Sequence, residues 1–138
     1  MLAAAAIHVG IVLAVMILVP LNSSAEIREF AVTDVTQIAG TWEGSAAYAA
    51  SRTRASGSDT GVTVTIKADG TWQANSPSGI ATNGTFTLKD GRVRFQVLTP
   101  QPPGWSNVGT WAFYENAGRL SMKSTRDDNN VTGDFVKK

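Results

Sequence analysis

From Gly40 onward, apolar and polar residues alternate along the chain with a period of two. Val62, Val64 and Ile66, for example, are separated by threonine residues. This period places successive side chains on opposite faces of a β-strand, so it predicts strands with one apolar and one wet face. Eight such strands are expected: Thr41–Ala49, Val62–Lys67, Thr71–Asn75, Thr85–Lys89, Arg92–Leu98, Gly109–Glu115, Arg119–Ser124 and Val131–Val136. Residues 40–138 are therefore predicted to form one all-β domain.

The connections between these strands are of two kinds, which alternate along the chain. Three are tight turns that contain glycine, at Ala68–Gly70, Lys89–Gly91 and Asn116–Gly118, where a hairpin needs a positive backbone angle. The other four are long: Ala49–Gly61, Asn75–Asn83, Thr99–Asn107 and Ser124–Asn130. An antiparallel up-and-down arrangement then has every tight turn at one end and every long connection at the other. Eight strands of this kind can close into a β-barrel, which removes the exposed sheet edges.

A triplet of glycine, threonine and an aromatic residue occurs four times, starting at Gly40, Gly70, Gly84 and Gly109. We expect each triplet to open a strand, with the glycine at the entry and the threonine on the wet face. The ring then points inward, which predicts a core containing Trp42, Trp72, Phe86, Phe95, Trp111, Phe113 and Phe135. We interpret the repeat as a feature of barrel geometry rather than as a recognition motif.

The N-terminal residues 1–25 predict a hydrophobic leader helix, because the chain is apolar from Leu2 to Val19. Small residues at Ser23 and Ala25 fit signal-peptide cleavage after Ala25, but the apolar run is also nearly long enough for a membrane anchor. Either reading predicts an exported protein that is periplasmic, secreted or membrane-anchored facing outside. Residues 26–39 are expected to form a lead segment with a short helical turn, capped by Asp34 with Gln37 three residues on.

The helical turn followed by IAGTWEG, at the first strand of an eight-stranded meander, resembles the calycins, which comprise the lipocalins and the avidin-like barrels. The resemblance extends from about Val32 to the C-terminus. It implies a lipocalin-like barrel with Trp42 lying across its closed end. Lipocalins place an arginine over this tryptophan from near the last strand, where the present chain has Lys137 and Lys138.

The amino-acid composition excludes several classes of partner, catalytic site and metal site. The net charge is +1 with both signs interspersed, so nucleic acid is not expected as a partner. The chain has no cysteine, and its one histidine, His8, lies in the leader, which excludes Ser-His-Asp and Cys-His catalysis and ordinary zinc sites in residues 26–138. We therefore expect no catalytic residues, no metal and no cofactor. A membrane is expected as a partner only through an uncleaved leader, and the oligomeric state stays open.

The long-connection end carries the candidate binding residues. Arg52 and Arg54 come from one connection and Arg126 from another, and all three are expected to converge at the mouth, joined by Trp105 and Tyr48. With Trp72 and Phe86 below them, these residues predict a site for a small apolar or amphiphilic ligand with an acidic head.

Two other functions compete with ligand binding. Inward rings can fill the lumen of a small barrel, which would make the protein an envelope structural or protein-interaction module without a small ligand. An enzyme is the least expected reading, because so few catalytic groups remain. A cavity that reaches from the mouth towards Trp72 and Phe86 would favour the ligand.

Overall fold

The computed structural model describes residues 26–50, 55–100, 102, 105–125 and 131–138. These residues form nine β-strands and one short 3-10 helix: β1 (Arg28–Phe30), η1 (Val35–Gln37), β2 (Gly40–Tyr48), β3 (Gly57–Ile66), β4 (Thr71–Asn75), β5 (Ala81–Lys89), β6 (Arg92–Thr99), β7 (Val108–Asn116), β8 (Arg119–Ser124) and β9 (Val131–Lys137). The predicted leader, residues 1–25, lies outside the described residues. Within the described part of the chain, no helix reaches the length and hydrophobicity that a membrane crossing needs.

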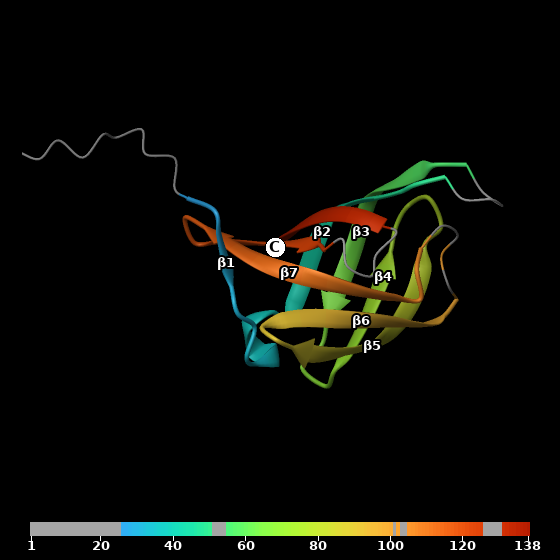
Figure 1. Ribbon diagram of the computed structural model, residues 1–138. Coiled ribbons are helices and arrows are strands. Elements are labelled where there is room, and N and C mark those ends of the chain that lie inside the picture. Colours follow the sequence, from blue (N-terminus) through green and yellow to red (C-terminus); the bar gives the residue numbers. More distant parts are fainter. Residues whose placement is uncertain (1–25, 51–54, 101, 103–104, 126–130) are drawn as a thin grey trace, which may run out of the picture.

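Strands β2 to β9 form a closed antiparallel barrel (Figure 1). Each of these strands pairs with its neighbour in the sequence, and the pairing of β9 with β2 closes the sheet. The predicted up-and-down barrel of eight strands is thus confirmed. Two strands begin several residues earlier than predicted, since β3 begins at Gly57 rather than Val62 and β5 at Ala81 rather than Thr85. Their first residues are small or polar and carry no alternation of apolar and polar side chains.

The ninth strand, β1, was not predicted. It pairs with the second half of β7, with Phe30 opposite Phe113, while β6 pairs with the first half, from Val108 to Trp111. An ion pair of 2.9 Å between Arg92 Nε and Glu29 Oε1 further ties β1 to the start of β6. The lead segment therefore extends the barrel wall where β6 leaves β7 uncovered.

The two ends of the barrel differ as the connections predict. We call the end with the turns at residues 67–70, 90–91 and 117–118 the tight-turn end, and the end with the four long connections the loop end. Gly70, Gly91 and Gly118 all have positive φ, at 88°, 76° and 77°. Asp90 and Ala117 precede two of these glycines and also have positive φ, at 53° and 51°, as type I′ turns require.

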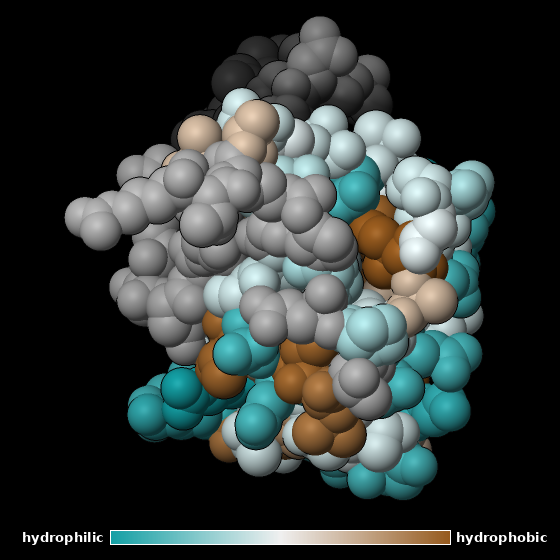
Figure 2. Space-filling view, turned by 90° about the vertical axis from the view of Figure 1, so that its right-hand side faces the viewer, coloured by the Kyte–Doolittle hydropathy of each residue, from teal (hydrophilic) through white to brown (hydrophobic). Residues whose placement is uncertain are grey.

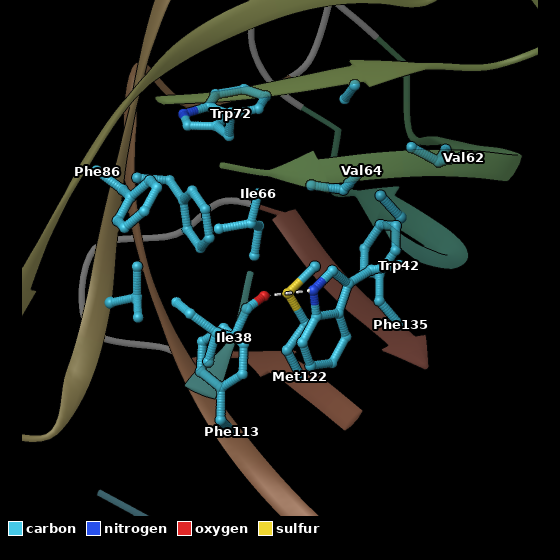
Figure 3. Packing of buried hydrophobic residues seen from close by; sticks show 14 of the residues in the cluster. Ile38, Trp42, Val62, Val64, Ile66, Trp72, Phe86, Phe113, Met122 and Phe135 are labelled. Atoms are coloured by element: carbon cyan, nitrogen blue, oxygen red, sulfur yellow. Dashed lines mark hydrogen bonds between the residues drawn. The ribbon is translucent and has the colours of Figure 1, made fainter. Parts of the chain in front are cut away.

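The lead segment closes the tight-turn end. Asp34 and Gln37 form the predicted capping box around η1, and the Val32 amide donates a 2.8 Å hydrogen bond to the Gly91 carbonyl of the β5–β6 turn. Behind η1, the indole nitrogen of Trp42 donates a 2.9 Å hydrogen bond to the Ile38 carbonyl (Figure 3). Both side chains are 0% exposed, so Trp42 belongs to the floor of the barrel, where the resemblance to calycins implied it would be.

The predicted inward rings form the core (Figure 3). All seven are buried or packed against the buried cluster, and only Trp111 of them is half-buried. The prediction that every triplet opens a strand is wrong for Gly84, which lies in the middle of β5. Gly84 is instead the cross-strand partner of Trp72. A Cβ atom at Gly84 would overlap the Gln96 carbonyl oxygen and lie 2.7 Å from the Trp72 indole nitrogen. The absence of a side chain thus makes room for a ring on the next strand.

Candidate functional site

A cavity of about 60 Å³ lies inside the barrel, towards the loop end. Its described wall is predominantly aromatic and apolar: Trp72, Phe95, Trp105, Trp111 and Phe135, with Val64, Val97, Met122, Val131, Ser106 and Gly109. Figure 2 looks onto the loop end and shows apolar surface exposed between hydrophilic residues. Such an arrangement can hold an apolar group away from water, but it offers few polar contacts.

Trp72 forms the deep side of the cavity and is fixed on several sides. Its indole nitrogen donates to the carbonyls of Thr85 and Gln96, at 3.0 and 3.2 Å, and its ring meets Phe95 edge-on at a centroid distance of 5.9 Å. Gly84 lies against the same ring. The alternation of β4 points Trp72 inward, and these contacts then fix its orientation.

Trp111 forms another side of the cavity and is less tightly enclosed. Its ring packs against Phe135 at a centroid distance of 5.5 Å and against Phe95 at 6.4 Å. Gly133 of β9 lies directly behind the ring, and a Cβ there would overlap it. Sequence reasoning placed Trp111, Phe95 and Phe135 in the core but gave no indication that they leave a void between them.

Trp105 closes over the cavity from the connection between β6 and β7. Its amide donates a 3.1 Å hydrogen bond to the Pro102 carbonyl, and its indole nitrogen donates one of 3.1 Å to Asp59 Oδ2 on β3. The ring is half-buried and packs against the core. The tryptophan in this polar connection therefore folds back onto the barrel rather than standing out in solvent.

Asp59 contacts Trp105 at the mouth of the cavity, and it is not among the site residues predicted from the sequence. In the sequence, Asp59 falls in the predicted long connection Ala49–Gly61. The structure places it within β3 instead, where its carboxylate holds the Trp105 indole. No signal in the alternation of residues could have shown this, because the strand contains an irregularity at this point.

The predicted site residues are only partly brought together. Trp72 and Trp105 line the cavity. Tyr48 is half-buried at the loop end of β2, opposite Gly57, and Phe86 is buried against Phe95; neither is part of the cavity wall. Arg52, Arg54 and Arg126 lie outside the described residues.

A second hollow, of about 180 Å³, lies over β5 and β6 and is bordered by Phe86 and Val108 together with polar side chains. Thr85, Thr87, Arg94 and Gln96 are exposed residues of the outer face of the sheet. The hollow is thus a groove between side chains on the outer surface, and it lacks the aromatic enclosure of the cavity.

Among the acidic residues that the structure describes, the two with shifted pKa values, Asp34 and Asp69, lie at the tight-turn end. Backbone and side-chain hydrogen bonds from Thr36 lower the pKa of Asp34, and side-chain and backbone hydrogen bonds from Thr71 lower the pKa of Asp69. Both carboxylates stabilise local backbone turns, so neither shift indicates a catalytic group. Among the described residues, no group of three or more His, Cys, Asp or Glu could hold a metal ion.

The chain matches no protein-family model, no curated protein and no solved structure. Its eight-stranded closed barrel is consistent with a calycin-like fold.

Proposed function

We propose that this protein is an exported calycin-like barrel that binds a small apolar or amphiphilic ligand in the cavity at its loop end. The observation that carries the proposal is the concentration of tryptophan: three of the four in the chain, Trp72, Trp105 and Trp111, line one cavity. A fully packed lumen would leave no such space between them. The apolar run from Leu2 to Val19 supports export, with the barrel either released or held by this segment.

The cavity volume limits the ligand. Pockets for drug-sized molecules measure about 300 to 1,000 Å³, whereas this cavity measures about 60 Å³. The ligand is therefore a compact group, or one end of a longer molecule. Each buried methylene contributes about 0.8 kcal/mol, so a group of about five carbons contributes about 4 kcal/mol. Because association also costs entropy, this free energy sets an upper limit on the affinity of such a group, at a dissociation constant of about 1 mM.

A packed structural or protein-interaction module is the second candidate, and the small size of the cavity favours it. Rings and aliphatic side chains from β2 to β9 fill most of the lumen. In this alternative the cavity is a packing defect, and no small molecule occupies it. Catalysis is the least favoured role, given the residue types that the chain contains.

Tryptophan fluorescence can test the proposal, because the fluorophores line the cavity. The test panel consists of linear and branched alcohols and fatty acids of about four to ten carbons, which are smaller than the drug-sized molecules that larger pockets hold. We expect them to change the tryptophan emission in a saturable way. Substitution Val97→Phe should abolish the change by filling the cavity from its wall. Leu98→Phe is the matched control, since Leu98 is the next residue, points outward and is 59% exposed. Silence across the panel, or equal binding by the two variants, would favour the packed module.

A further inference from the structure

Asp59 faces the interior of the barrel because of a β-bulge in β3. Gly44 lies opposite Val62 but Ala46 lies opposite Asp59, so two steps along β2 correspond to three along β3. Gly61 supplies the extra residue with φ of 63°, as glycine does in bulges of this type. Cross-strand partners share a face of the sheet, and Ala46 is an interior residue, 2% exposed. The bulge therefore turns the Asp59 carboxylate inward, where regular alternation would have placed it on the outer face with Thr63 and Thr65.

The inward carboxylate is linked to an aromatic enclosure through Trp105, and Asp59 is not itself one of the described lining residues. Asp59 accepts the hydrogen bond of the Trp105 indole nitrogen, and the wall contains the rings of Trp72, Trp105, Trp111, Phe95 and Phe135. The described residues of this wall include neither lysine nor arginine. When an indole N–H donates to a carboxylate, the hydrogen bond shifts electron density into the indole ring. The face of a tryptophan ring also attracts cations more strongly than the face of any other aromatic side chain.

We propose that the preferred ligand carries a compact methylated ammonium group, which the aromatic wall of the cavity and the Asp59 carboxylate recognise together. The assignment rests on the proposed function and names its ligand class. A trimethylammonium group is compact, as the cavity of about 60 Å³ requires, and its methyl groups suit an apolar wall. Its positive charge is delocalised over those methyl groups, so it is attracted both to the ring faces and to the carboxylate. An acidic head, by contrast, would be repelled by the negative charge of Asp59.

Three ligands of nearly the same shape separate charge from size. Choline is cationic, 3,3-dimethylbutan-1-ol is its neutral analogue with carbon in place of nitrogen, and 3,3-dimethylbutanoate is anionic. Each is titrated into the full chain and followed by tryptophan fluorescence and calorimetry. We expect choline to bind about tenfold more tightly than the neutral alcohol and the anion to bind most weakly. Phosphatidylcholine vesicles form a fourth arm of the experiment. If the protein binds choline and also co-sediments with the vesicles, the trimethylammonium group that it recognises belongs to a lipid headgroup.

Substitution Asp59→Asn tests the carboxylate. The amide oxygen of asparagine can still accept the Trp105 hydrogen bond, so the fold and the neutral alcohol's affinity should persist while the preference for choline falls severalfold. Asp134→Asn is the matched control, because it removes the same charge from an exposed carboxylate of β9. Equal affinities for the three ligands, tighter binding of the anion, or an unchanged preference in Asp59→Asn would overturn the cation assignment and leave ligand binding intact. Absence of binding by every ligand in both panels would overturn both proposals.

Discussion

At the tight-turn end Trp42 is 0% exposed and donates to the Ile38 carbonyl, whereas at the loop end Trp105 is half-buried and donates to the side chain of Asp59. The first tryptophan is held by backbone and by the lead segment. The second is held by one carboxylate next to a cavity. The same residue type thus fills the core at one end and borders a cavity at the other, and the two ends should respond differently to substitution.

The largest difference is expected from removing each tryptophan. Trp42→Ala should lower the free energy of unfolding by about 3 to 5 kcal/mol, because it empties the floor and leaves the Ile38 carbonyl without its donor. Trp105→Ala should lower it by only about 1 kcal/mol, because the ring is half-buried next to an existing void. Urea unfolding followed by circular dichroism measures both. Equal losses would show that the loop end is as tightly packed as the floor.

Substitutions of Gly84 and Gly133 compare how much free space the core has near the backbone and near the cavity. Gly84→Ala should destabilise the protein by about 3 kcal/mol, the upper part of the range for overpacking, because the new Cβ meets the rigid backbone at Gln96. Gly133→Ala should destabilise it by about 1 kcal/mol, because the obstacle is the Trp111 ring, which can move into the cavity. Midpoints of urea unfolding give the order of the two effects. The reverse order would mean that the cavity cannot accept the displaced ring.

A stabilising substitution is available at the tight-turn end. Ala117 has a φ of 51°, a conformation that disfavours residues with a Cβ by about 1 to 2 kcal/mol unless they are asparagine or aspartate. Ala117→Asn should therefore raise the free energy of unfolding by about 1 kcal/mol and leave ligand binding at the other end unchanged. Asp90→Asn, at the equivalent position of the β5–β6 turn, serves as the control and should change little. An unchanged midpoint in Ala117→Asn would show that the turn carries no strain.

The smallest effect concerns pH and involves the carboxylates of Asp34 and Asp69. Their pKa values are lowered from the ordinary value of 3.8 by hydrogen bonds in the folded state. Their stabilisation is then fully present above pH 3.8 and is lost as the pH falls through the lowered pKa values. The double variant Asp34→Asn/Asp69→Asn should lose less stability than the parent between about pH 5 and about pH 3, a window on either side of the ordinary pKa of 3.8. Parallel losses in thermal unfolding experiments would assign acid sensitivity to other groups.

The strands and their order could be predicted because they depend on local patterns. Alternation in segments such as Val62–Ile66 and glycine at Gly91 and Gly118 are sufficient to indicate hairpins, and Asp34 with Gln37 indicates the capping box. The three-residue strand β1 is too short to show a period. Its partner on β7 lies far along the chain, so only tertiary packing defines it.

The candidate site was less predictable because it depends on small departures from regular geometry. Alternation points Trp72 and Trp111 inward, but the space between them depends on how the rings tilt and on Gly84 and Gly133. The position of Asp59 depends on one extra residue in β3. A prediction from strict alternation does not detect such a bulge, so it assigns the residues beyond the bulge to the wrong face of the sheet.

The positions of residues 26 and 138 have a practical consequence for attaching the protein to a surface. Arg28 pairs with Glu115 near the β7–β8 turn, and the Lys138 amide bonds to the Thr41 carbonyl at the start of β2. Residues 26 and 138 thus leave the barrel on the side remote from the mouth, as Figure 1 shows for the chain entering β1. A surface, bead or fluorescent fusion attached next to residue 26 or residue 138 would orient the opening towards the surrounding solution. Immobilised protein could therefore be screened with soluble compounds without blocking their route into the lumen.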